Sequence, residues 1–402
     1  MASVELEPFA SEHEGYTGNA GNTVDRWYHR AAVVLWPRER TFVIRAKASA
    51  QWGIGEIATA LKAGDDERAR QMATRLLPFW VQVTQREEGR PFFEQTLRIA
   101  AGLGTPELAT SLLQPFTLER LTTKAAPRLV ALLDRYGFEW CRALLARWAS
   151  GNRHEGAERR MAWLVSVPGL CRSLCAGDSP HALKLARWLV ADEWAWLVKQ
   201  WQRVLEATHA KHTLNALTRM SKPILGLLES SLIVEHPDLH GEIVRFLTSA
   251  GRDRPVRLSA HLLRTAHENC ARDVLRGLGL KPVHRHCLED LTTRLRAPAR
   301  LKDNWSLPAP DRCQCKLCGK LARFLLAQDQ VRFEWPLAKE QRAHIHQIVD
   351  AHDLPVSHTT RRRGSPFTLV LVKTDAVFER DAAERRFWQG ELGWLTKTAA
   401  AF

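Results

Sequence analysis

Three cysteines have the spacing of a metal-binding knuckle. Cys313, Cys315 and Cys318 form the pattern C-x-C-x-x-C. Thiolate and imidazole groups are the ligands that Zn²⁺ prefers, and structural zinc sites take four such ligands in a tetrahedron. The chain holds eight cysteines, and we expect no signal peptide in its acidic first residues. These features predict a reducing, cytoplasmic location, where clustered thiols bind metal more often than they form disulfides.

A histidine is expected to complete this ligand set, because no fourth cysteine follows nearby. His344 and His346 lie two residues apart on a predicted helix, so their side chains point roughly 160° away from each other and only one can face the cysteines. We favour His344 as the fourth ligand, with His346 and His358 as alternatives. His352 falls on the apolar face of the same helix and is expected in a core. Four protein ligands would make a closed, structural Zn²⁺ site.

Three weaker constellations are not expected to bind metal. His236 and Asp238 have the H-x-D spacing of facial-triad iron sites, with His286 further along, but that triad sits on the strands of a barrel and this segment has helical periodicity. Cys171 and Cys175 lie one helical turn apart and are expected in a core. A last group is expected at an exposed polar helix end: Cys270, His284, His286 and Cys287.

The sequence contains no catalytic motif that points to a reaction. It has no Gly-rich phosphate loop, no H-E-x-x-H and no nucleophile elbow. Residues 361–363 are three consecutive arginines at a predicted hairpin turn and could bind phosphate, although a charge run in a turn is usually only solvated. We therefore name no catalytic residue and no organic cofactor for this chain.

The cysteines belong to a predicted small α+β domain over residues 301–402. A Pro-Ala-Pro linker at 308–310 precedes them. Hydrophobic periodicity then predicts a helix, a short strand, a second helix, a hairpin and a closing helix. These elements are expected at 319–326, 332–335, 338–352, 356–361 with 367–374, and 376–394.

Residues 47–300 have helical periodicity throughout. Apolar residues recur every three or four positions and are interrupted by Gly, Pro or Asp, which predicts successive amphipathic helices. No fixed repeat period is present, so we predict an irregular α-solenoid-like helical array. Helices are expected at 54–62, 67–82, 92–102, 106–113, 118–121, 126–136, 139–150, 158–165, 179–189, 194–207, 211–229, 241–250, 256–276 and 284–296. Most of the fifteen Trp residues fall here and are expected to fill the core between helices.

Residues 1–46 form a third predicted segment with strand character. A Gly/Asn-rich loop at 15–22 precedes the β-branched and aromatic run at 27–36, which Pro37 ends. This run predicts a buried strand. Residues 41–45 are the one neighbouring candidate for a second strand.

The positive charge of the chain is local. The net charge is +14, and residues 251–402 carry 27 of the 58 basic residues but only 17 of the 44 acidic ones. Lys and Arg attract the phosphates of nucleic acids, so residues 251–402 are the expected contact region if nucleic acid is a partner. A protein partner is also expected, and no membrane association, because the apolar runs are far shorter than the roughly 20 residues of a membrane helix.

Two segments together resemble a known family. One is GYTGNAGNT at 15–23 running into RWYHRAAVVLWPR at 26–38; the other is the C-x-C-x-x-C pattern with RAHIH at 342–346 and RGSPFTLVLVKT at 363–374. Both are similar to the C-terminal part of large fungal and bacterial proteins with a prolyl-hydroxylase-like 2-oxoglutarate/Fe(II) oxygenase domain. The resemblance implies that the first segment closes the oxygenase domain. It places the iron ligands and the 2-oxoglutarate arginine upstream, so Fe²⁺ and 2-oxoglutarate are not expected in this chain.

These observations favour binding over catalysis. We predict a scaffold or binding protein with a structural zinc domain, related to the C-terminal part of the oxygenase-domain proteins. One alternative is the accessory half of a 2-oxoglutarate/Fe(II)-dependent dioxygenase. A second is a nucleic-acid-binding protein that uses its basic C-terminal half.

Overall fold

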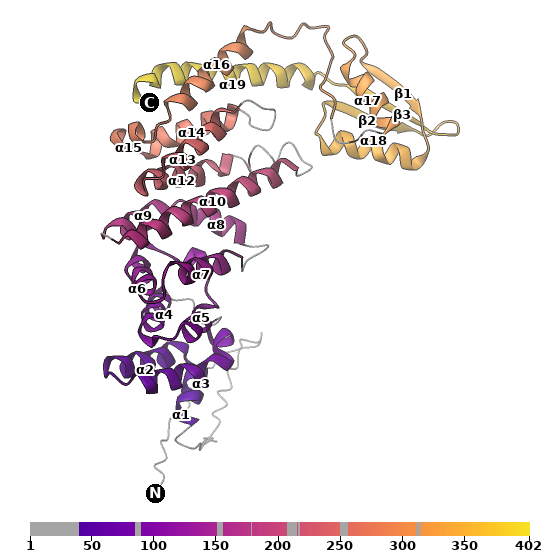
Figure 1. Ribbon diagram of the computed structural model, residues 1–402. Coiled ribbons are helices and arrows are strands. Elements are labelled where there is room, and N and C mark those ends of the chain that lie inside the picture. Colours follow the sequence, from indigo (N-terminus) through magenta and orange to yellow (C-terminus); the bar gives the residue numbers. More distant parts are fainter. Residues whose placement is uncertain are drawn as a thin grey trace, which may run out of the picture. The chain divides into compact units, whose positions relative to one another are not determined.

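The computed structural model is mainly α-helical with one small sheet, which confirms the predicted fold class (Figure 1). The predicted loop at 15–22 and strand at 27–36 lie outside the described residues. The chain divides into two compact units, Met1–Arg153 and His154–Phe402, called unit 1 and unit 2 below. The described residues are 40–84, 90–150, 156–177, 179–206, 215, 218–249, 256–310, 313 and 315–402.

Unit 1 consists of short helices around a continuous apolar core. Ile54, Leu76, Trp80 and Leu112 come from different parts of this helical segment and are almost fully buried in one cluster. The helices are α1 (Thr41–Ala48), α2 (Ala50–Lys62), α3 (Asp66–Thr84), α4 (Arg90–Leu103), α5 (Pro106–Leu113), α6 (Ala126–Tyr136) and α7 (Phe138–Ser150), with 3₁₀ turns at Leu118–Arg120 and Thr123–Ala125.

The strand considered at residues 41–45 is wrong, because these residues form helix α1. Ala46 of α1 is fully buried and packs against Gly53 of α2, where an added Cβ would lie 2.9 Å from the Ala46 Cβ. Only glycine permits this close approach of the two helices. The tertiary contact with α2 and α3 therefore overrides the β-branched local preference of Val43 and Ile44.

Two tryptophans of unit 1 are core residues whose indole N–H groups also donate hydrogen bonds to carbonyls at the end of a helix. Trp80 and Trp148 are buried, and their indole N–H groups donate to the carbonyls of Leu112 and Leu113, each at 2.7 Å. These carbonyls belong to the last turn of α5, where backbone acceptors lack an intrahelical donor. The tryptophans thus fill space and satisfy buried acceptors that would otherwise be costly.

Unit 2 stacks helices α8 to α16 and α19 in successive layers, while α17 and α18 lie beside the sheet (Figure 1). Helix α12 is central, since it contacts α8, α9, α10, α13 and α14. The helices are α8 (Gly156–Leu164), α9 (Val167–Cys175), α10 (Pro180–Glu206), α12 (Ser221–Ile233), α13 (Pro237–Thr248), α14 (Val256–Asn269), α15 (Arg272–Gly277), α16 (Lys281–Arg296), α17 (Lys316–Leu326), α18 (Lys339–Ala351) and α19 (Ala376–Thr398). A 3₁₀ turn, η4 (Ala399–Ala401), follows α19.

Several helices of unit 2 differ from the sequence prediction, three of them for a clear physical reason. The helices expected at 179–189 and 194–207 are one helix, α10, because no Gly or Pro separates them. The helix expected at 256–276 divides into α14 and α15 around Cys270. Helix α9 was not predicted, because Pro168 and Gly169 look like helix breakers. Pro168 lies in the first turn of α9, where its missing N–H costs nothing.

The last helix, α19, begins in the core of the sheet with Val377 and then packs against α14 and α16. Arg264 of α14 pairs with Glu391 at 2.8 Å, and its guanidinium lies 4.4 Å from the ring centroid of Trp394. The same arrangement recurs seven residues earlier in both helices. Arg257 pairs with Glu384 at 3.6 Å, and its guanidinium lies 4.3 Å from the ring centroid of Phe387. Residues 301–402 therefore share a compact unit with the preceding helices.

The sheet lies between α17 and α19 in sequence and has three antiparallel strands. They are β1 (Arg332–Pro336), β2 (Val356–Arg361) and β3 (Thr368–Lys373), in the order β1-β3-β2. Helices α17 and α18 share a core with the sheet, in which Phe324, Ile345 and Leu371 are almost fully buried. Residues 313–373 are called the C-terminal module below.

Helices α8 and α10 are joined by a buried ion pair. Arg160 is 5% exposed and Glu193 is fully buried, and the guanidinium donates to both carboxylate oxygens at 2.8 and 2.6 Å. Arg160 also lies over the ring of Trp196 at 4.4 Å. Removing one partner of such a buried pair is strongly destabilising, because the charge of the other partner stays buried.

No helix in the described part of the chain combines the length and the apolar composition needed to cross a membrane.

Glu193→Gln is expected to lower the free energy of unfolding by about 3–5 kcal/mol, because it removes the buried carboxylate that accepts two hydrogen bonds from Arg160. The carboxylate of Asp192, 3.9 Å from the guanidinium, is more exposed and is a weaker counter-charge. Urea denaturation followed by circular dichroism measures this decrease. Glu158→Gln is the matched control, since Glu158 pairs with Arg219 at 3.7 Å on the surface and should cost less than about 1 kcal/mol. Equal decreases for the two variants would contradict the role given to the buried pair.

Candidate metal centre

Four ligand atoms converge at one point of the C-terminal module. The sulfur atoms of Cys313, Cys315 and Cys318 and a ring nitrogen of His344 all lie within 4.8 Å of one another. The His344 Nε2 atom is 3.8, 3.5 and 3.3 Å from the three sulfurs in that order. In a tetrahedral zinc site, bonds of about 2.1 and 2.3 Å place nitrogen about 3.6 Å from each sulfur. The group can therefore hold a metal ion.

The start of α17 positions two of the three sulfurs. Cys315 is the N-cap of α17, and its sulfur accepts a hydrogen bond from the backbone N–H of Cys318 at 3.4 Å. The Cys318 side chain belongs to the first helical turn and is buried. The helix therefore folds the C-x-x-C half of the pattern into a knuckle, in which a free N–H of the first turn bonds to the Cys315 sulfur.

The packing of α18 brings in the fourth ligand. Ile345 and Val349 of α18 are buried in the core shared with α17, which fixes the rotation of α18 about its axis. His344, beside Ile345, then faces the cysteines. His346 points elsewhere, and its Nδ1 is hydrogen-bonded to the Nδ1 of His358, a residue of β2. The structure thus brings His344 to the cysteines, as favoured from the sequence, and pairs the two alternatives with each other.

The close approach of the three thiols favours the binding of a cation. The N–H of Cys318, and then the neighbouring side chains, lower the pKa of Cys315 to about 6. Burial, and then hydrogen bonding and repulsion from the other two cysteines, raise the pKa of Cys318 to about 12. One thiolate thus forms readily, whereas a second negative charge is opposed. A bound divalent cation removes this repulsion and allows every sulfur to ionise.

The other histidine and cysteine groups have structural positions. His236 is the N-cap of α13, and its Nδ1 accepts from the N–H of Leu239 at 3.4 Å, so the H-x-D pair is part of a helix start. Cys171 is fully buried, and burial raises the pKa of its thiol to about 12. The exposed helix end expected around His284 is wrong. His284 is 5% exposed, and its Nε2 is 3.0 Å from the carbonyl oxygen of Leu395 beneath α19.

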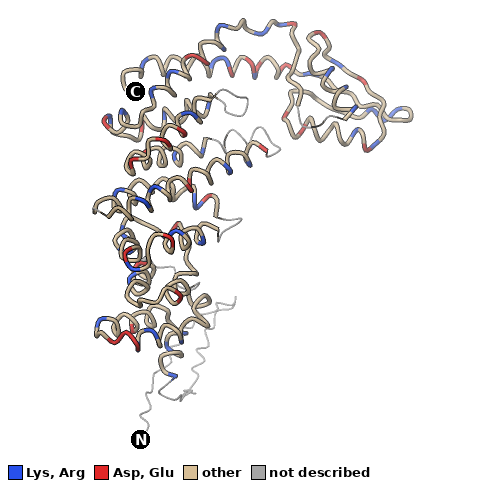
Figure 2. The backbone as a smooth tube through the Cα atoms, viewed as in Figure 1, with Lys and Arg blue, Asp and Glu red and all other residues tan. Residues whose placement is uncertain are grey.

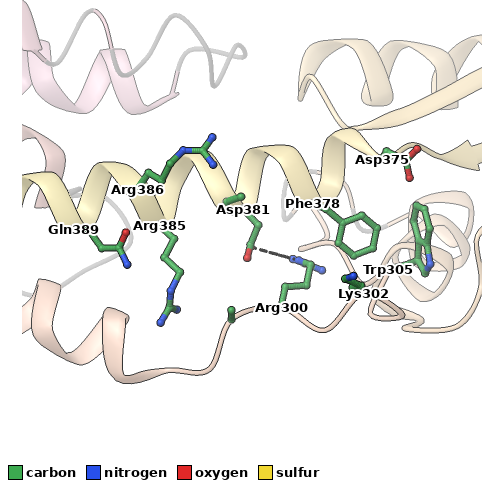
Figure 3. A pocket seen from close by; sticks show the side chains of 11 residues that line it. Arg300, Lys302, Trp305, Asp375, Phe378, Asp381, Arg385, Arg386 and Gln389 are labelled. Carbon is green, nitrogen blue, oxygen red and sulfur yellow. Dashed lines mark hydrogen bonds and ion pairs between the residues drawn. The ribbon is translucent and has the colours of Figure 1, made fainter.

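A cavity of about 500 Å³ lies between residues 299–305 and the first half of α19 (Figure 3). Two of its four lining cations, Arg300 and Arg385, already have partners within the protein. Arg300 pairs with Asp381 at 3.4 Å, and Arg385 donates to the carbonyl of Leu295 at 2.8 Å, at the end of α16. Figure 3 shows Arg385 and Arg386 on opposite sides of α19, so they do not converge on one ligand. The lining also includes Lys302, Trp305, Phe378 and Gln389.

Two buried cations of the module were not singled out from the sequence. Arg342 donates to the carbonyl oxygens of Leu337 and Phe367. Lys373 is 2% exposed and donates to the carbonyls of Leu325 and Ala327 at 3.1 and 2.7 Å, at the end of α17. Neither residue stands out in the sequence, because a cation that binds carbonyls far along the chain has no local signature.

Comparison with protein-family models, with curated proteins and with solved structures finds no match for this chain. Its function must therefore be argued from the chemistry of the site itself.

His344→Ala is expected to abolish stoichiometric metal binding, because three thiols without the imidazole leave the coordination shell incomplete. His346→Ala is the matched control and should keep the metal, since His346 lies on the same helix but bonds to His358. Elemental analysis of the purified variants measures both. Loss of the metal from His346→Ala, with the metal retained by His344→Ala, would overturn the ligand assignment.

Metal binding at pH 7 is expected to release at least one proton per ion, because the Cys318 thiol must ionise. Titration calorimetry in two buffers of different ionisation enthalpy counts these protons. Since the pKa of Cys315 is depressed to about 6, its thiolate persists above that pH, and affinity should fall steeply as the pH drops through 6. Binding without proton release, or with unchanged affinity at pH 5, would argue against thiolate ligation.

Proposed function

We propose that this chain is a non-catalytic binding or scaffold protein whose C-terminal module is stabilised by a structural zinc ion. The convergence of Cys313, Cys315, Cys318 and His344 carries this proposal. Three soft thiolates and one imidazole suit Zn²⁺ better than the hard cations Mg²⁺ or Ca²⁺, which take oxygen ligands. The distances from the His344 nitrogen to the three sulfurs are close to those of a tetrahedral shell.

A structural role is supported by the number and origin of the ligands. Four protein donors fill a tetrahedral shell and leave no position for water or substrate, whereas catalytic zinc keeps one position open. The ligands also come from two separate parts of a small module, the start of α17 and the middle of α18. The core of this module is modest, and metal binding contributes directly to the folding of such domains.

Several arginines of the basic C-terminal half are neutralised by acidic residues of α19. Arg257, Arg264 and Arg300 all lie within the most basic stretch of the sequence, and each pairs with an acidic residue of α19. This internal neutralisation reduces the positive surface that residues 251–402 can offer to a polyanion. A partner is better sought on the C-terminal module than along the whole basic half.

The relation to 2-oxoglutarate/Fe(II) oxygenase-domain proteins remains a proposal that rests on the resemblance of residues 15–38 and 313–374. The described residues do not support iron chemistry at His236, whose ring caps α13. An accessory role beside a separate oxygenase domain would use the same zinc module as a binding element. Both versions therefore make the module the functional part of this chain.

Removal of the metal by a chelator is expected to unfold the C-terminal module while the helices of unit 1 stay folded. Hydrogen–deuterium exchange of the full chain should show at least tenfold faster exchange in α17 and α18, because the metal joins their ligand-bearing turns. Amides of α2 and α3 serve as the internal control. Cys315→Ser should reproduce the effect without chelator. Unchanged exchange in α17 and α18 after verified metal removal would refute the structural role.

A further inference from the structure

The turn between β2 and β3 is an exposed basic loop. Residues 361–367, called the arginine loop below, have the sequence RRRGSPF, and every one of them is exposed. The loop contains three arginines and no acidic residue, as Figure 2 shows at the end of the hairpin. It therefore presents positive charge at the outer end of the module.

Two of the three guanidinium groups face solvent without a carboxylate. Arg361 pairs with Glu334 of β1 at 2.7 Å. For Arg362 and Arg363, no ion pair with an acidic residue occurs within the described part of the chain. Their charge is not neutralised within the protein, in contrast to the arginines that contact α19.

The root of the loop is held by the helix that carries the metal ligand His344. Arg342, two residues before His344, is buried and donates to the carbonyl of Phe367 at 3.3 Å. Its guanidinium also lies 5.4 Å from the ring centroid of Phe367. The N–H of Leu337 donates to the same carbonyl at 3.1 Å. A metal-fixed α18 thus presents the arginine loop in a defined position.

The same loop also carries a partly exposed aromatic residue, Phe367. Phe367 is 38% exposed, which is unusual for a residue of this size and leaves one part of its ring open to a ligand. Guanidinium groups bind phosphate in a bidentate manner, and aromatic rings stack on nucleic-acid bases. Bases are free to stack on a protein in a single strand but not inside a duplex.

We propose that the arginine loop binds single-stranded nucleic acid, with Arg362 and Arg363 on phosphates and Phe367 stacked on a base. The inference rests on the proposed function, because the zinc module positions the loop. An acidic peptide would satisfy the arginines but would offer no base for Phe367. The combination of adjacent cations and an exposed ring therefore favours a single strand over an acidic protein.

The test uses the full zinc-loaded chain and a fluorescein-labelled 15-nucleotide oligouridylate, with binding followed by fluorescence anisotropy. Arg362→Glu/Arg363→Glu should weaken binding at least tenfold. It should also make the salt dependence shallower, by about 0.7 in log K per log salt for each phosphate that the variant no longer neutralises. Phe367→Leu should weaken binding about fivefold or more, because stacking contributes about 1–3 kcal/mol per base.

Arg272→Glu/Arg276→Glu is the matched control, since both arginines are exposed on α15 and the charge change is identical. It should alter binding less than twofold. Equal weakening in both double variants would assign binding to general positive charge and overturn the loop site. So would tighter binding of a duplex or of polyglutamate, or no binding at about 50 mM salt. Metal content of each variant is measured in parallel, so that failure of the loop proposal with zinc intact leaves the zinc proposal standing.

Discussion

The C-terminal module depends on the convergence of three sulfur atoms and one imidazole on a single point. Burial, and then the two neighbouring thiols, raise the pKa of Cys318 to about 12, while the hydrogen bond from the Cys318 N–H lowers the pKa of Cys315 to about 6. A metal ion bound by these four groups would remove the repulsion between the thiolates and would cross-link the start of α17 to the middle of α18. The position of Arg342, and through it the root of the arginine loop, follows from the placement of α18.

The module is connected to the helical layers of unit 2 through α19. This helix follows β3 and packs on α14 through two Arg–Glu–aromatic sets spaced one heptad apart. It also contacts α16, where the His284 ring meets the carbonyl of Leu395. It has few fully buried side chains, so ion pairs and cation–π contacts contribute much of its attachment. The same contacts neutralise arginines that, in the sequence, look available for a polyanion. The charges of Arg362 and Arg363, by contrast, remain exposed.

Much of this fold could be predicted from local patterns. Amphipathic periodicity identified most helices of both units, because a helix that buries one face must repeat its apolar residues every three to four positions. The pattern was less informative where tertiary contacts decide the secondary structure. Helix α1 is an example, because its packing depends on Gly53 in the next helix. It also missed α9, since Pro168 starts a helix as well as it breaks one.

The sequence by itself determined the three cysteines as a knuckle, because their spacing is short and the first turn of a helix brings such residues together. It left three histidines open as the fourth ligand. Only the tertiary structure decided among them, since the burial of Ile345 and Val349 sets which face of α18 meets the cysteines. Total charge was likewise visible in the sequence. The packing of α19 decided which arginines form ion pairs inside the protein and which face solvent. These pairs join residues more than a hundred positions apart, as Arg264 and Glu391 show.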